Sequence, residues 1–281
     1  MQILHPRLER MHAQRVVSWH EHLYEDFTTN ELDLRRAEDL IEAGDRLGID
    51  VMAVSRPDPS PIVPPERFRM YNDAIYEAMR RWPGRFYGYA FVDGGFSAEA
   101  VHEIRRAVED LGFVGVKLYH QYRITSPVMR PIIETAIELD IPILLHSGKL
   151  TRAPETQPFI SDGTYIAEAA RRYPEATFLM GHIAGGGDWD WQIKAVAGVP
   201  NVYADLAGSV YDAGLVEKSV RLIGAANLLF ATDMSMSQSV GRILAADISD
   251  ADLATILDNP GFARFLRNAI VLTQSNRPTW R

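Results

Sequence analysis

The sequence contains no cysteine, no long apolar run and no run of lysine and arginine. Without cysteine the chain forms no disulfide, and it offers neither a thiolate metal ligand nor a cysteine nucleophile. Any metal must therefore be held by nitrogen and oxygen atoms. The formal net charge of −8 and the absence of a basic stripe argue against nucleic acid as a partner.

No stretch of the chain approaches the ~20 apolar residues that a membrane-spanning helix needs, so we expect no membrane partner. Residues 1–15 also lack the apolar run of a secretory signal, and we expect a soluble, cytoplasmic protein. Hydrophobic residues make up 47% of the 281 residues, which is enough to bury a sizeable core. We find no linker, repeat or low-complexity tract, so residues 1–281 are expected to form one domain.

Short apolar runs alternate with longer amphipathic segments along the chain. The short runs are rich in β-branched or aromatic residues and have the length of strands. Eight strands alternating with helices predict an α/β fold, a (β/α)8 TIM barrel, because parallel strands joined by right-handed crossovers close into a barrel at this chain length. A doubly wound open sheet is the alternative. The expected strands are 16–20, 49–55, 86–92, 113–119, 141–146, 177–182, 201–205 and 227–233; the expected helices are 31–47, 65–81, 98–111, 127–139, 163–173 and 212–223, with extra C-terminal helices at 250–257 and 259–268.

Histidines stand at the ends of three of the expected strands. His20 and His22 end the first strand, His146 the fifth and His182 the sixth, while Asp233 ends the eighth. In a (β/α)8 barrel the carboxyl ends of the strands meet at one mouth, so side chains that are distant in sequence can lie together there. This pattern predicts a metal site at the mouth.

The spacing within the first strand also predicts side-chain directions. Residues two apart on a strand share a side, so His20 and His22 can both face the barrel axis, whereas Glu21 should point toward the surrounding helices. A single histidine at a strand end is more often a hydrogen-bonded structural residue than a metal ligand. We assign the remaining histidines outside the expected strand ends to that structural class: His5, His12 and His102.

Imidazoles and one carboxylate are donors that suit zinc, with manganese or iron as alternatives. Such a site leaves a coordination position for water and can lower the pKa of that water from ~15.7 toward ~7. The donor set therefore indicates chemistry with metal-activated water near neutral pH. A nearby carboxylate would then relay the proton.

Segments around these residues resemble the amidohydrolase-related family, a group of metal-dependent TIM-barrel hydrolases and decarboxylases in the amidohydrolase superfamily. The resemblance covers nearly the whole chain, and the combination of segments is specific although no single segment is. One departure is Ser18, because family members commonly carry aspartate two residues before the first histidine. The segments are 19–22 (WHEH), 115–118 (GVKL), 143–148 (ILLHSG), 180–186 (MGHIAGG), 201–205 (NVYAD), 230–233 (FATD) and 256–259 (ILDN).

The resemblance implies roles for the strand-end residues. His20, His22, His146 and Asp233 would bind the metal. His182 would be a further ligand, or the catalytic group that orients water or polarises the substrate. Asp233 would also be catalytic, because it is the position expected to handle the proton of the attacking water.

Lys117 ends the fourth strand and is one of four lysines in the chain. In binuclear members of the superfamily a carboxylated lysine on this strand bridges two metals. The same Lys-Leu stretch also occurs in relatives that resemble one-metal enzymes. We favour one ion over two, and Lys117 is then either a ligand or a cation that binds a substrate carboxylate or closes a salt bridge.

Other charged and aromatic residues lie in the loops that would build the mouth. Arginine can bind a carboxylate through paired hydrogen bonds, so the charges suggest a small substrate that carries one. Loop arginines are also commonly solvated, and that alternative stays open. The candidate substrate-binding residues are Arg56, Lys117, His120, Arg123 and Arg152, with Trp19, Tyr24, Tyr119, Trp189 and Trp191 as candidate aromatic walls.

These observations support three functional hypotheses. The first is a metal-dependent hydrolase that acts on an amide, ester or lactone bond of a small molecule. The alternative is a metal-dependent non-oxidative decarboxylase of an aromatic or unsaturated carboxylic acid, and fold alone does not choose between the two. The third is a non-catalytic barrel, which the histidine set disfavours. A homo-oligomer is compatible with all three.

Overall fold

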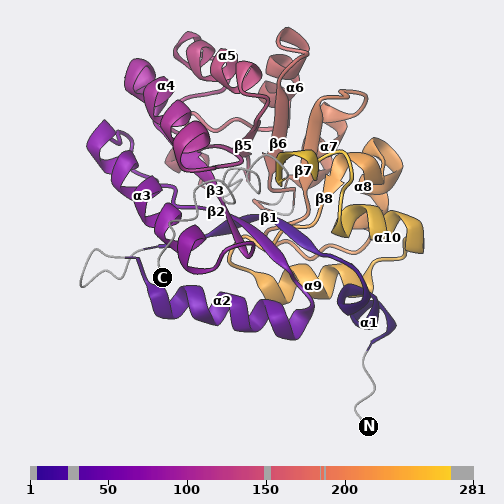
Figure 1. Cartoon of the computed structure of the whole chain (residues 1–281). Helices are drawn as coiled ribbons and strands as arrows, with labels where there is room; N and C mark the ends of the chain where they lie inside the picture. The colour runs from indigo at the N-terminus through magenta and orange to yellow at the C-terminus, as the bar shows by residue number, and fades with distance from the viewer. Residues whose placement is uncertain (1–4, 25–31, 149–152, 184, 187, 267–281) are drawn as a thin grey trace, which may run out of the picture.

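The computed structural model describes residues 5–24, 32–148, 153–183, 185, 186 and 188–266. Eight parallel strands form one sheet in the order β1 to β8, and helices surround that sheet (Figure 1). Backbone hydrogen bonds from Trp19 N to Phe230 O (3.0 Å) and from Asp233 N to His20 O (2.8 Å) join the last strand to the first. The predicted (β/α)8 barrel is therefore confirmed in place of the open sheet.

Every expected strand overlaps an observed one. The largest difference is in the eighth strand, expected at 227–233 and observed at Leu228–Leu229, while the first strand continues to His22 and so includes both of its histidines. The strands are β1 (Val17–His22), β2 (Val51–Ser55), β3 (Phe86–Phe91), β4 (Gly115–Leu118), β5 (Pro142–His146), β6 (Thr177–Gly181), β7 (Val202–Asp205) and β8 (Leu228–Leu229).

The helices match the expected segments with three additions. The additions are α1 (Pro6–Ala13), α7 (Trp189–Val196) and α9 (Met236–Ala245). Serines and Gly241 give α9 a low intrinsic helix propensity, so its helical form depends on packing against the barrel. The expected helix 259–268 lies partly outside the described residues. The other helices are α2 (Leu34–Leu47), α3 (Pro65–Arg81), α4 (Ser97–Arg105), α5 (Arg130–Glu138), α6 (Gly163–Arg172), α8 (Leu215–Ile223) and α10 (Asp250–Leu257).

The core has two parts. One fills the space between the barrel and its helices, and the other fills the barrel interior. Trp19 belongs to the interior part and packs edge-on against Phe262, with ring centroids 4.6 Å apart, so it does not serve as the aromatic wall that we expected. Inward residues such as Leu144 and Tyr203 fill the interior, and the next inward positions are His146 and Asp205. Apolar packing therefore ends where the polar mouth begins.

None of the described helices is long and apolar enough to cross a membrane.

Candidate active site

Strand β1 places two histidines inside the barrel because its pairing with β2 is irregular. The register shifts between Ser18 and Glu21. Such a shift breaks the strict alternation of a strand, so consecutive residues can face the same side. Trp19 lies in the interior core, and His20 lies directly above it at the mouth. His20 Nε2 is 3.2 Å from His22 Nε2, so both imidazoles face one point.

Three donors converge at that point. The ligand atoms of His20, His22 and Asp233 all lie within 4.8 Å of one another. Asp233 Oδ1 is 3.1 Å from His22 Nε2 and 3.6 Å from His20 Nε2. Two imidazole nitrogens and a carboxylate at this spacing fit a divalent cation of the zinc, manganese or iron type.

His182 and His146 lie beside these three residues. His182 Nε2 is 3.0 Å from Asp233 Oδ2, and the His182 ring centroid is 5.7 Å from that of His20. The His146 ring lies 5.1 Å from the His182 ring, but His146 Nε2 lies 3.0 Å from Gln157 Nε2. The structure thus brings the predicted strand-end residues to the same mouth of the barrel. Among the described residues only His20, His22 and Asp233 form the tight donor group, and the ligand role of His146 stays a prediction.

Side chains behind the donors fix the orientation of their rings. His20 Nδ1 is 2.9 Å from Asp205 Oδ2, and Ala207 N donates to Asp205 Oδ1 at 3.0 Å. His22 Nδ1 is 3.1 Å from Ser55 Oγ. A hydrogen bond at Nδ1 holds each ring so that its Nε2 is free to bind a metal.

Our sequence analysis did not identify Asp205 as a site residue. The signal was present, because Asp205 ends the seventh strand just as Asp233 follows the eighth. Its side chain is completely buried, and burial raises its pKa to about 7 although the nearby His182 lowers it. Partnering His20 is what makes this buried position tolerable for a carboxyl group.

Replacing Asp205 with alanine is expected to weaken Mn²⁺ binding by about 10- to 100-fold, because His20 loses the partner that orients its ring. The dissociation constant is measured by isothermal titration. Asp258→Ala, which removes a carboxylate paired with Arg15 at the molecular surface, serves as the control. Equal dissociation constants for Asp205→Ala and the wild type would show that Asp205 does not support the donor group.

Burial and charge oppose each other at Asp233 and His182. Burial raises the pKa of Asp233, but the imidazoles of His20 and His182 hold that pKa well below its usual range. Burial lowers the pKa of His182, but the carboxylate of Asp233 outweighs this effect and leaves that pKa raised. Both shifts favour a charged His182–Asp233 pair.

A comparison with protein families shows which family the chain belongs to. The model of the amidohydrolase family matches residues 19–260, a range that includes all of these site residues. The chain belongs to the amidohydrolase family. No curated protein matches the chain at a significant level.

Solved structures share the barrel of this amidohydrolase. A 2,6-dihydroxybenzoate decarboxylase from Rhizobium is 19% identical, with a TM-score of 0.69, over 92% of this chain and 99% of that one. A dihydroxybenzoic acid decarboxylase from Polaromonas sp. JS666, with bound manganese and the inhibitor 2-nitroresorcinol, is 20% identical, with a TM-score of 0.69, over 94% and 98%. A 4-oxalomesaconate hydratase from Rhodopseudomonas palustris is 16% identical, with a TM-score of 0.69, over 92% and 98%. At these identities the likeness establishes the fold.

Lys117 lies at the centre of the amidohydrolase site. Its side chain is completely buried, and its Nζ is 2.9 Å from His20 Nε2. Burial lowers the pKa of Lys117 to about 8, although the carboxylates of Asp233 and Asp205 oppose this shift. The position is compatible with either role that the sequence predicts, as a ligand or as a cation for the substrate.

The other predicted substrate-binding residues differ in their distance from the metal donors. The guanidinium of Arg56 is buried between two rings, 3.9 Å from the Tyr71 centroid and 5.0 Å from that of Tyr24. The Tyr24 ring in turn lies 5.9 Å from the His22 ring. His120 lies 6.3 Å from His146, measured between ring centroids.

Arg123 is not brought to the donor group. Arg123 donates to Pro158 O at 2.8 Å and lies over the ring of Tyr165, so its described contacts are with the loop before α6 and with α6 itself. Arg152 lies outside the described residues, and its role stays a prediction.

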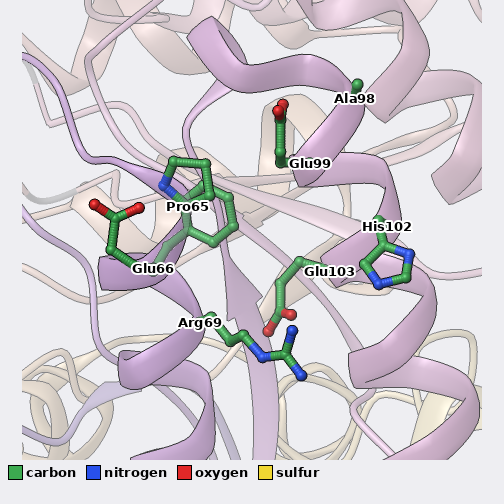
Figure 2. Close-up of a pocket in the computed structure, with 8 residues that line it drawn as sticks. Pro65, Glu66, Arg69, Ala98, Glu99, His102 and Glu103 are labelled. Carbon is green, nitrogen blue, oxygen red and sulfur yellow. The ribbon is translucent and has the colours of Figure 1, made fainter.

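A separate groove lies on the outside of the barrel, between α3 and α4 (Figure 2). Pro65, Glu66 and Arg69 come from α3, and Glu99 and His102 come from α4. None of the residues that line the groove lies at the mouth, so the groove is separate from the candidate active site. Its His102 provides a control position for experiments on the site histidines.

Proposed function

We propose that the chain is a metal-dependent, non-oxidative decarboxylase of an aromatic or unsaturated carboxylic acid. The observation that carries this proposal is the His20–His22–Asp233 donor group with the buried Lys117, whose Nζ lies 2.9 Å from His20 Nε2. Structural neighbours named as dihydroxybenzoate decarboxylases support it. The hydrolysis that our sequence analysis favours stays a prediction.

A single divalent ion would be held by His20, His22 and Asp233. Manganese is the ion bound in the Polaromonas neighbour, and nitrogen and oxygen donors accept manganese, zinc and iron alike. When bound, the ion would supply positive charge that polarises the oxygen atoms of the substrate and orients them.

Aromatic and cationic side chains would bind the substrate. Tyr24 lies beside His22, and the ring of Tyr119 lies 4.3 Å from that of His146, so each tyrosine contacts a histidine of the mouth. A planar substrate would pack between such rings. The positive charges of Arg56 and Lys117 would attract its carboxylate.

The His182–Asp233 pair would supply the proton. In decarboxylation the bond between the carboxyl carbon and its neighbour breaks, its electron pair stays on that neighbouring carbon, and carbon dioxide leaves. The carbon then takes a proton from the pair, and solvent water restores the proton. The raised pKa of His182 and the lowered pKa of Asp233 place this proton on His182, and the 3.0 Å contact between His182 Nε2 and Asp233 Oδ2 holds it next to the donor group.

The test is a panel of hydroxybenzoates, including 2,6-dihydroxybenzoate, incubated in D₂O with the Mn²⁺-loaded protein. We expect carbon dioxide release and one deuterium, detected by mass spectrometry, at the carbon that lost the carboxyl group. His182→Ala is expected to lower the turnover number by about 100-fold or more, since a positioned acid contributes that much.

His102→Ala is the matched control, because this histidine lies in the outer groove and its loss should leave turnover unchanged. A parallel panel of esters and lactones tests the hydrolytic alternative. Hydrolysis of that panel without any release of carbon dioxide would overturn the proposed decarboxylation.

A further inference from the structure

The carboxyl group of Glu21 is completely buried behind the metal donors. Strand alternation predicts that it points toward the surrounding helices, and its hydrogen bonds reach the segment that follows β8. We propose that Glu21 is a positioning residue that holds the carboxylate of Asp233 in the donor group. The proposal rests on the metal site of the proposed function and not on the decarboxylation.

Glu21 binds the residues on both sides of Asp233. Its Oε1 accepts a hydrogen bond from Met234 N at 2.8 Å. Its Oε2 accepts one from Thr232 Oγ1 at 2.6 Å. One carboxylate therefore spans the turn that carries Asp233 and fixes the turn at two points.

The turn needs such support because of its backbone conformation. Asp233 has φ +41° and Met234 has φ +60°, which places two consecutive non-glycine residues in the left-handed region. Residues persist in that region only where surrounding contacts hold them. The carbonyl of His20 accepts from Asp233 N at 2.8 Å, and two side chains also hold the segment: Glu21 accepts from Met234 N, and Ser18 Oγ accepts from Thr232 N at 3.1 Å.

The same carboxylate also links the two strands that provide the ligands. Glu21 Oε1 accepts from the backbone N–H of His22 at 2.8 Å, so His22 and Met234 share one acceptor. Thr232 Oγ1 lies 2.7 Å from Ser18 Oγ, which extends the network along β1. Ser18 stands where the resemblance leads one to expect aspartate, and the carboxylate at this end of β1 comes from Glu21 instead.

Glu21→Ala is expected to let the turn relax and to move Asp233 Oδ1 away from His22 Nε2, now 3.1 Å apart. The Mn²⁺ dissociation constant should rise by about 10-fold or more, the usual consequence of removing support for a metal ligand. Glu21→Gln should keep a dissociation constant close to that of the wild type. Its amide oxygen can accept from Met234 N, and its NH₂ group can donate to the Thr232 hydroxyl.

Glu103→Ala is the matched control. Glu103 is also buried, with 2% exposure, and it accepts hydrogen bonds from Asn72 and Arg106 on the helical side of the barrel. We expect Glu103→Ala to lower the melting temperature but to leave the Mn²⁺ dissociation constant unchanged. A purely structural role for Glu21 predicts the same behaviour for both alanine variants.

The experiment combines Mn²⁺ titration calorimetry with crystal structures of the metal-free wild type and Glu21→Ala. Displacement of Asp233, with weakened binding that Glu21→Gln restores, supports the proposal. An unmoved Asp233, or equal loss of affinity in Glu103→Ala, overturns it. If Glu21→Ala does not fold, Thr232→Val removes one of the two flanking contacts and gives the same readouts. A wild type that binds no Mn²⁺ contradicts the proposed function, while the position of Asp233 in the metal-free crystals still tests Glu21.

Discussion

Replacing Asp233 with alanine is expected to lower turnover by at least about 1,000-fold and to weaken Mn²⁺ binding severely. Asp233 contacts three imidazoles of the site: His22 Nε2 at 3.1 Å, His182 Nε2 at 3.0 Å and His20 Nε2 at 3.6 Å. Its loss removes one proposed metal ligand and one half of the proposed proton-carrying pair. Steady-state kinetics and titration calorimetry measure the two effects.

The control for this variant is Asp212→Ala. Asp212 lies on the loop after β7, where its carboxylate accepts a hydrogen bond from Trp189 Nε1, and it is exposed. We expect this change to leave metal affinity and turnover unaltered. If Asp233→Ala retained Mn²⁺ affinity and merely lost turnover, Asp233 would act only as an acid, and the ligand set would need to exclude it.

Adding a methyl group at Gly185 is expected to lower turnover by about 100-fold with little change in the overall fold. A Cβ atom at position 185 would lie 1.7 Å from His182 Nδ1 and 2.0 Å from His182 Cε1, far inside any tolerated contact. A Cβ at Gly148 would also meet this ring, 2.4 Å from its Cε1. The two glycines therefore form a slot that fits the imidazole of His182.

The slot matters because packing, and not a hydrogen bond, holds the His182 ring on its Nδ1 side. His182 Nδ1 is buried and has no hydrogen-bond partner among the described residues, while Nε2 contacts Asp233. Gly185→Ala must therefore displace the ring from Asp233, and misplacement of a reacting group by about 1 Å costs on the order of 100-fold in rate.

Kinetics of Gly185→Ala and Gly241→Ala provide the measurement. A Cβ added at Gly241, in α9, meets no atom within 4 Å, so Gly241→Ala should behave like the wild type. The expected change for Gly185→Ala lies in the turnover number rather than in KM. Equal turnover numbers for the two alanine variants would mean that the position of His182 does not matter to the reaction.

The barrel was predictable because the periodicities of strands and of helices alternate along the sequence. Alternating strands and helices imply parallel pairing, and a parallel barrel brings His20, His146 and Asp233 to one end regardless of their separation in sequence. Two helices were not predicted: α7, which follows a glycine-rich segment, and α9, which is rich in serine. Glycine and serine lower the local helix propensity, and tertiary packing stabilises these helices.

Finer features of the site depend on contacts that no local pattern encodes. The hold of Glu21 on the turn at Asp233 depends on hydrogen bonds between β1 and the segment that follows β8, which local alternation does not predict. Asp205 was missed because a single carboxylate at a strand end gives no indication of its partner, His20. The placement of Gln157 beside His146 depends on the loop after β5, whose path the sequence leaves open.

The reaction type was the least predictable feature, because hydrolases and decarboxylases in this family share one donor set. The sequence alone favoured hydrolysis, whereas the decarboxylases among the structural neighbours favour the alternative that we propose. The guanidinium of Arg56 lies over the Tyr24 ring, and that ring lies beside His22. Arg123 is engaged with the loop before α6, and its predicted role in substrate binding has no contact in support.

Anomalous diffraction from a crystal soaked in Mn²⁺ tests the central claim most directly. We predict a single anomalous peak at coordination distance from His20 Nε2, His22 Nε2 and the carboxylate of Asp233. A peak that none of these three side chains contacts, or the absence of any peak at the mouth, would contradict the account.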